Sequence, residues 1–259
     1  MSAFEDGITD ALARFDEAPL DLLAARALQQ RVDRKYLLSQ RLLEPLLADL
    51  VADYRVARAG DVLAARYETV YFDTSDRRLF DDHRRGRFPR YKVRLRHHCD
   101  RQLTFLEVKR RGGCTSKARL ELPFSGGAAN MSAAATELSD GAPGFIDAHC
   151  PIGAHRLMSC VRVTFTRLTL VGHAFNERVT FDWNIAFGDE HRSERLPGLV
   201  VAEVKQARFA NAGPVVHVLR RLHIREETLS KYCLATVRLA PVRANAFKPA
   251  LRAVERVIA

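Results

Sequence analysis

The stretch YKVRLRHH at residues 91–98 alternates apolar and cationic side chains with a period of two. Alternate residues of a β-strand point to opposite faces, so Val93 and Leu95 share one face of the predicted strand. Arg94 and Arg96 share the other face, where neighbouring cations repel one another. We therefore expect an anion, or water, to meet this charged face.

The same alternation recurs in segments that lie far apart along the chain. Glu107 and Lys109 share a phase in FLEVKR, and Glu203 and Lys205 share a phase in VAEVK. Other ionic residues with this phase are Lys117, Arg119, Glu121, Arg178 and Asp182. Solvent on one face would explain any single strand, but a wide sheet with a bare polar face tends to curl or be covered. We predict that the sheet closes with its apolar face outward under helices and its charges around an internal channel.

The rest of the chain predicts one α+β domain, since no linker separates two compositions. Period-two patterning from 66 to 124, and again from 160 onward, predicts antiparallel strands. Residues 125–156 are rich in Gly, Ala, Ser and Pro and predict a loop with a short helix. Residues 9–30 predict one packing helix or two short ones split at Pro19, and Ser39 is predicted to cap a following helix. Helices are also predicted over 214–223, over 226–239 and beyond Pro249.

Composition and charge narrow the classes of function. The chain has 259 residues, a mass of 29.2 kDa, a formal net charge of +10 and a pI near 9.7, which favours an anionic partner. Five cysteines without C-x-x-C spacing indicate neither a zinc site nor a disulfide framework. The acidic N-terminus does not resemble a secretory signal, and no apolar run approaches the roughly 20 residues of a membrane span. We expect a soluble, cytoplasmic protein.

The residue types in the predicted channel suit a linear phosphate chain. Arginine offers a planar fork of donors and lysine a point charge, and phosphoryl groups present oxygens in every direction. The carboxylates Glu107, Asp182 and Glu203 are either counter-ions to neighbouring bases or hard oxygen ligands for Mg²⁺ or Mn²⁺. Glu203 is the first choice of metal ligand.

Nine short motifs occur in an order that identifies a family resemblance. The chain resembles the VTC domain, the polyphosphate polymerase member of the triphosphate tunnel metalloenzymes (CYTH-like superfamily), over about residues 29–240. Residues 1–28 would then form an N-terminal helical segment and residues 241–259 a basic C-terminal tail. The motifs are RVDRKYLL, YFDT, YKVRLR, FLEVKRR, SKARLEL, RVTFTR, ERVTFD, VAEVK and LSKY.

The resemblance implies a fold, a reaction and a set of site residues. The fold is a closed antiparallel eight-stranded tunnel barrel with flanking helices. The reaction transfers the γ-phosphoryl group of ATP to a growing polyphosphate chain with a divalent metal, Mn²⁺ or Mg²⁺. Glu203 is the implied metal ligand, and Ser230 adds a hydroxyl to the phosphate site. The implied phosphate-binding and catalytic cations are Lys35, Arg94, Arg96, Lys109, Lys117, Arg167, Arg178 and Lys231.

One departure helps to choose among relatives. Hydrolytic members of the superfamily begin with E-x-E-x-K, whereas the same frame here is Arg31, Asp33 and Lys35. The altered acid pair argues against the alternative of a triphosphatase with the same fold. A non-catalytic module that binds polyphosphate or nucleotide is a further alternative. We assign no role to His97 and His98 and a structural role to the aspartate of YFDT.

Two kinds of partner are disfavoured. Nucleic-acid binding would favour aromatic residues interleaved with the bases, and the basic strands interleave Val and Leu instead. The basic segment at 243–259 is expected to be a solvated helix rather than a membrane-surface helix. If the product is moved across a membrane, we expect a separate membrane protein to do it.

Overall fold

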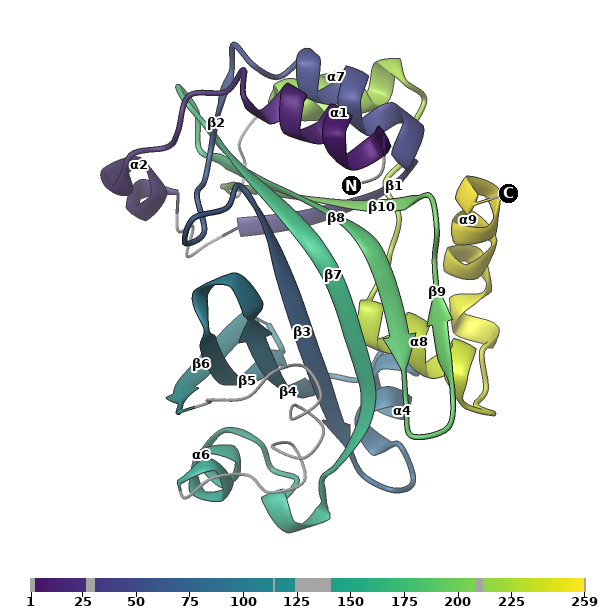
Figure 1. Ribbon diagram of the computed structural model, residues 1–259. Coiled ribbons are helices and arrows are strands. Elements are labelled where there is room, and N and C mark those ends of the chain that lie inside the picture. The colour runs from purple at the N-terminus through teal and green to yellow at the C-terminus, as the bar shows by residue number, and fades with distance from the viewer. Residues whose placement is uncertain (1–2, 27–30, 114, 124–140, 208–211, 259) are drawn as a thin grey trace.

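The computed structural model describes residues 3–26, 31–113, 115–123, 141–207 and 212–258. Among these, ten strands form a single antiparallel sheet, which curves strongly (Figure 1). The strands are β1 (Arg31–Ser39), β2 (Tyr54–Val56), β3 (Ala64–Asp73), β4 (Arg90–His98), β5 (Leu103–Arg111), β6 (Thr115–Leu122), β7 (Met158–Gly172), β8 (Glu177–Gly188), β9 (Ser193–Arg195) and β10 (Leu199–Ala207).

Helices flank the sheet, so the predicted α+β class with strands in the middle is confirmed. They are α1 (Ala3–Leu12), α2 (Leu20–Ala25), α3 (Leu43–Ala48), α4 (Arg78–Arg84), α6 (Ala142–His149), α7 (Pro214–Arg221), α8 (Lys231–Leu239) and α9 (Lys248–Ile258). Short 3₁₀ helices lie at Gln40–Leu42, Cys99–Arg101, Ala154–Arg156 and Asn245–Phe247. None of the described helices is both long enough and apolar enough to cross a membrane.

The strand order is β1-β10-β8-β7-β3-β4-β5-β6, with β2 beside β7 and β9 beside β8. No backbone ladder joins β1 to β6 among the described residues, so the structure gives a curved open sheet and does not confirm the predicted closed barrel. The segment before α8 covers part of the free edge of β1 instead. Glu226 bridges to Tyr36, and the amide of Glu227 donates to the carbonyl of Lys35 at 2.8 Å. That pairing shields backbone groups that an edge strand would otherwise expose.

The outer face of the sheet packs against helices, as the alternation predicts. Helices α1, α3 and α7 cover the β1, β2, β7, β8 and β10 part, where Leu38, Phe181 and Val204 are buried. Helix α6 covers the β3–β5 part, where Val93 and Leu106 are buried. In Figure 1 the first group lies at the top and α6 at the bottom. Burial on this face is the main stabilising contribution to the sheet.

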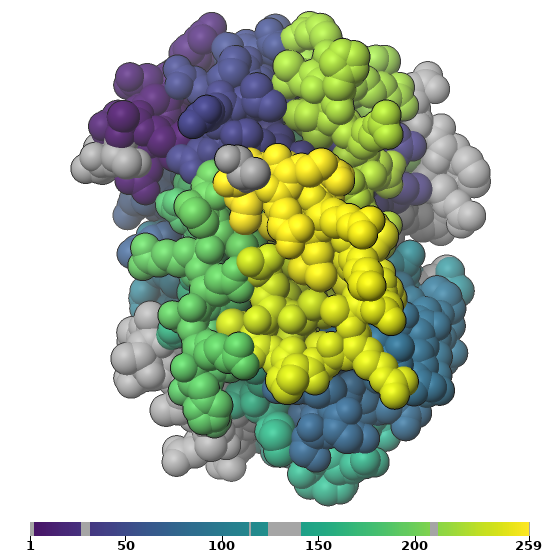
Figure 2. All heavy atoms as spheres, turned by 90° about the vertical axis from the view of Figure 1, so that its right-hand side faces the viewer, coloured from purple at the N-terminus to yellow at the C-terminus, as the bar shows by residue number. Residues whose placement is uncertain are grey.

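The inner face is defined here as the one that carries Lys35, Arg94 and Glu203. Part of it is apolar and packs against α4, α8 and α9, with Phe165 and Tyr232 in the buried cluster. Figure 2 shows the C-terminal residues (yellow) as a continuous layer on this side of the molecule. Helices therefore cover part of the inner face as well as the outer face. Helix α8 covers the apolar part of the inner face, and the charged side chains occupy the rest of it.

A β-bulge in β8 explains how this strand contributes side chains to both the charged and the apolar part of the inner face. Asn184 has a positive φ of 51°, and the register between β7 and β8 shifts between Thr164 and Thr166. The extra residue reverses the alternation, because two residues of β8 oppose one of β7. Asp182 and Ile185 therefore point to the same side, one in the charged region and the other against α8.

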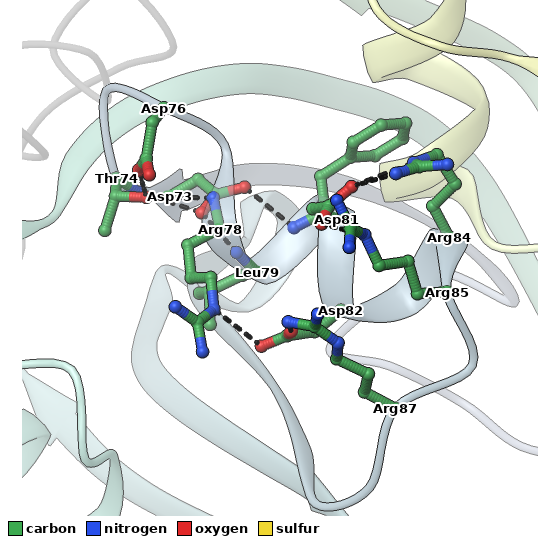
Figure 3. Close-up of polar contacts among 11 residues, drawn as sticks. Asp73, Thr74, Asp76, Arg78, Leu79, Asp81, Asp82, Arg84, Arg85 and Arg87 are labelled. Atoms are coloured by element: carbon green, nitrogen blue, oxygen red, sulfur yellow. Dashed lines mark hydrogen bonds and ion pairs between the residues drawn. The ribbon is translucent and has the colours of Figure 1, made fainter.

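Asp73 of the YFDT motif has the structural role that was predicted. Its carboxylate accepts hydrogen bonds from the amides of Leu79 and Phe80 at 2.7 and 3.0 Å, and Figure 3 shows it at the start of α4. It also accepts from the Tyr232 hydroxyl of α8. Asp73 thus ties the end of β3 to both helices.

Three local predictions have clear outcomes. The first helical region is two short helices separated around Pro19, as one of the alternatives proposed. Ser39 makes no side-chain capping bond, and a 3₁₀ turn follows it, so the predicted cap is wrong. His97 and His98 end a strand rather than lie in a loop, and they point to opposite faces.

Candidate functional site

Cations and carboxylates from most of the sheet and from α8 gather on the charged part of the inner face. They fall into three groups, each built around one carboxylate: Glu107, Asp182 and Glu203. The cations among them are Lys35, Lys92, Arg94, Arg96, Lys109, Lys117, Arg119, Arg167, Lys205 and Lys231.

Glu107 of β5 is held by bases from both neighbouring strands. Arg94 and Arg119 lie directly opposite it in the ladders, and their guanidinium groups approach its carboxylate to 2.6 and 2.8 Å. Lys117 Nζ lies 3.0 Å from the same carboxylate. Burial alone would raise the pKa of Glu107, but Arg94, Arg96 and Lys117 hold it well below its usual range. Glu107 is a fully engaged counter-ion.

Asp182 of β8 makes a second closed group. Its two oxygens accept from Nε and Nη2 of Arg167 at 2.6 and 2.7 Å, a bidentate arrangement, and Lys231 also contacts it. Burial opposes ionisation, yet Arg167 and Lys231 lower the pKa of Asp182 to about 2. The ring of Phe165 lies 5.0 Å from the Arg167 guanidinium carbon and 4.8 Å from Lys231 Nζ, which fixes both cations from the other side.

Glu203 of β10 is held far less tightly. Among the described residues its one ion pair is with Lys205, at 3.2 Å, and its side chain keeps 19% exposure against 1% for Glu107. Lys35 lies directly opposite it on β1 and Thr180 on β8. Burial would raise its pKa, but Lys205, Lys35, Arg167 and Lys231 hold the pKa of Glu203 well below normal, so it is ionised.

Contacts across the hollow join these groups. Lys109 of β5 reaches Asp33 of β1, with 3.9 Å between Nζ and a carboxylate oxygen, although no ladder connects the two strands. Lys92 of β4 donates to the Ser230 hydroxyl at 2.8 Å. Burial lowers the pKa of Lys92 to about 8, with Lys35 and Lys109 among the cations that add to the effect. The two ends of the sheet therefore face each other across one basic hollow.

The structure brings nearly all of the candidate residues together. Lys35, Arg167, Lys231 and Glu203 interact as one group, and Arg94, Arg96 and Lys117 share the field of Glu107. Ser230 is the N-cap of α8, and its hydroxyl accepts from the amide of Cys233 at 3.3 Å. Arg178 lies opposite Lys205 in the ladder. The side chain of Arg31 lies outside the described residues.

Sequence reasoning left three inner-face bases out of the site. Lys92, Arg119 and Lys205 contact Ser230, Glu107 and Glu203 respectively. Phase had already placed Arg119 and Lys205 among the channel charges, and Lys92 has the phase of Arg94. The motifs of the resemblance did not single them out.

The sequence profile of the VTC domain family matches residues 30–240. The chain belongs to the VTC domain family. This confirms the family resemblance. No curated protein matches the sequence.

Solved structures agree on the fold. A protein from Bacillus halodurans, described as a candidate adenylate cyclase, is 13% identical, with 78% of this chain and 94% of that chain covered and a TM-score of 0.50. A Hippeastrum protein, described as a candidate adenylyl cyclase with a dominant triphosphatase activity, is 12% identical, with coverage of 82% and 98% and a TM-score of 0.49. At 13% identity, the Bacillus halodurans structure supports only the fold of this chain.

The residues around Glu203 fit a divalent metal that also binds phosphate. Mg²⁺ and Mn²⁺ take oxygen ligands and usually bind through one or two carboxylates, several waters and substrate phosphates. Asp33 and Glu203 are diagonal neighbours on the inner face and act together on Lys109 and Lys205. Thr180, opposite Glu203, has a buried hydroxyl oxygen without a hydrogen-bond partner among the described residues. No group of three or more His, Cys, Asp or Glu that could hold a metal occurs in the described ranges.

Proposed function

We propose that this protein is an ATP-dependent polyphosphate polymerase, which transfers the γ-phosphoryl group of ATP to the end of a growing polyphosphate chain. The supporting observation is the pairing pattern of the carboxylates. Glu107 and Asp182 are sealed by bases, whereas Glu203 faces the hollow with one lysine against it. Cations thus surround an open carboxylate, and Asp33 lies diagonal to it, which suits a metal-bound triphosphate.

The bases would position the phosphates and neutralise their charge. Phosphoryl transfer requires placement and spread charge stabilisation more than a protein nucleophile, because the transition state carries its charge on oxygens. Lys35, Arg167 and Lys231 would hold one end of the triphosphate, and Ser230 would add a hydroxyl. The cations proposed for the remaining phosphates are Arg94, Arg96, Lys109, Lys117 and Arg178.

In the proposed reaction, a terminal oxygen of the chain attacks the γ-phosphorus. The bond between that phosphorus and the β–γ bridging oxygen breaks, and ADP leaves with the bridging oxygen. The attacking oxygen is already anionic at neutral pH, so no strong base is required. The metal at Glu203, when bound, supplies charge neutralisation to the phosphate oxygens.

Two further features belong to the proposal. Residues 226–231 and the uncovered edges of β1 and β6 would complete a tunnel around the polyphosphate chain, with the Lys109–Asp33 contact as one crossing point.

Arg31, Asp33 and Lys35 replace the acid pair of the hydrolytic relatives, which supports transfer to phosphate over transfer to water. A separate membrane protein would move the product if it leaves the compartment.

Incubation of the purified protein with ATP and Mn²⁺, or Mg²⁺ in parallel, tests the proposal. Phosphorus NMR and gel electrophoresis are expected to detect internal phosphoanhydride groups and a ladder of long chains. Release of orthophosphate as the only product would replace the polymerase with a triphosphatase. Binding of ATP without any product would leave a non-catalytic binding module.

A further inference from the structure

Like charges oppose each other at the end of the β4–β5 ladder. Arg90 lies directly opposite Arg111, and Lys92 lies directly opposite Lys109. All four have the phase of Arg94 and therefore belong to the inner face. Like charges directly opposite on a sheet are destabilising, so this arrangement has a cost in the isolated protein.

The described residues provide no carboxylate to offset that cost at Arg90 or Arg111. Neither arginine has an ion pair among them, although Arg90 stacks on Phe88 with 4.9 Å from its guanidinium carbon to the ring centre. The nearby helix α4 differs. There Asp81 and Asp82 pair with every arginine that Figure 3 labels, namely Arg78, Arg84, Arg85 and Arg87.

His83, in the last turn of α4, faces the same cations. Burial lowers its pKa to about 2, and Lys92, Arg90 and Arg111 add to the effect, so the ring is neutral. Its Nε2 atom and the Nε atom of Arg90 are buried and have no hydrogen-bond partner among the described residues. Buried polar atoms are nearly always satisfied in native proteins, and the Nε–H of Arg90 is a donor that an anion can satisfy.

The position of this group gives the ligand its chemistry. Lys92 and Lys109 belong both to the hollow and to the opposed pairs, so the positive charge continues from the hollow to Arg90 and Arg111. Same-face residues on a strand recur about every 6–7 Å, which makes a row of cations rather than a single point. A row suits an extended anion with closely spaced charges.

We propose that Arg90, Lys92 and Arg111 form a subsite for phosphate groups of a polyphosphate chain beyond those held in the hollow. The inference rests on the proposed function. It adds the side of the hollow at which one end of the polyphosphate chain would leave, because that end would pass this subsite. Tripolyphosphate fills the hollow and leaves the subsite empty, whereas a long chain occupies both.

The double variant R90Q/R111Q tests the subsite by calorimetric titration at fixed ionic strength without metal. Affinity for long-chain polyphosphate is expected to fall about tenfold, and affinity for tripolyphosphate less than about twofold. R90K/R111K retains the charges and is expected to restore most of the long-chain affinity. The matched control R78Q/R85Q removes two arginines that are already paired, and it should leave both affinities unchanged.

Each other outcome overturns the subsite. An equal loss for both ligands would mean that Arg90 and Arg111 shape the hollow itself, and no loss would mean that the chain does not reach them. A loss for ATP alone would assign the group to the nucleoside end. Because binding is measured without turnover, a wild-type protein that only releases orthophosphate would end the proposed polymerase function and leave the chain-length comparison intact.

Discussion

The tripeptide E-V-K occurs in two strands of the inner face, and its glutamates have different surroundings. Glu107 in β5 has an arginine directly opposite on each side, Arg94 and Arg119. Glu203 in β10 has Lys35 on one side and Thr180 on the other. The same three letters therefore give a buried counter-ion in one strand and an open carboxylate in the other, because the neighbouring strands differ.

This difference explains how a strongly basic hollow remains folded. Ionised side chains removed from water require partners, and Glu107 and Asp182 each neutralise several bases at once. Glu203 contributes less to this neutralisation and stays accessible to a ligand. Substitution of each glutamate should therefore affect a different property, one activity and the other stability.

Glu203→Gln should have the largest effect. The substitution keeps the shape and removes the negative charge proposed to hold the metal, so polyphosphate formation is expected to fall about 100-fold or more. Metal-free affinity for tripolyphosphate should stay the same or rise, since one negative charge has left the hollow. Initial rates of product formation and titration calorimetry measure the two quantities.

Glu121→Gln is a matched control for Glu203→Gln, because Glu121 has the same phase on β6 and is exposed. The initial rate of polyphosphate formation by Glu121→Gln should remain within about twofold of wild type. Activity of Glu203→Gln close to that of wild type would remove Glu203 from the reaction and with it the contrast between the two tripeptides.

Glu107→Gln should act mainly on stability. Arg94, Lys117 and Arg119 would lose their shared partner, and breaking a buried ion pair by removing one member costs about 3 kcal/mol. Urea unfolding at neutral pH should therefore show a large drop in the free energy of unfolding. Glu203→Gln should change it by less than about 1 kcal/mol. Equal losses for the two variants would show that the two surroundings are energetically alike.

Asp182 should give the smallest effect, visible in acid. Its folded-state pKa of about 2 lies below the unfolded value of about 3.9, so the ionised form stabilises the folded state. That contribution is fully present above about pH 4 and is lost as the pH falls toward 2, by about 2 kcal/mol. Urea unfolding across this range should therefore show wild type losing stability faster than Asp182→Asn. Parallel curves would mean that Asp182 does not hold Arg167 and Lys231 as the structure has them.

The alternation of apolar and ionic residues was sufficient to predict most strands and the face of the sheet that carries the ionic side chains. It could not predict the bulge at Asn184, because a reversal of alternation looks the same as the end of a strand. Nor could it place α4, since residues 78–84 are mostly charged and its start is fixed by Asp73, a side chain outside the helix. These features depend on contacts between elements rather than on local pattern.

The sequence predicted which residue types form the candidate site, but it could not predict which side chains pair with each other. Both E-V-K glutamates were possible counter-ions or metal ligands by sequence. Only the register placed two arginines beside Glu107 and none directly opposite Glu203. The sequence also could not predict that no ladder joins β1 to β6 among the described residues, because the number of strands does not determine whether a sheet closes.

The pairing of β1 with β10 has a consequence for biosynthesis. Lys35 emerges from the ribosome long before Glu203 and Ser230. Contacts between distant parts of a sequence form slowly, because a long loop must close first. Until then Lys35 lacks the glutamate that lies opposite it, and it is exposed to any polyanion nearby. The charged hollow can form only after residues 203–231 have been made.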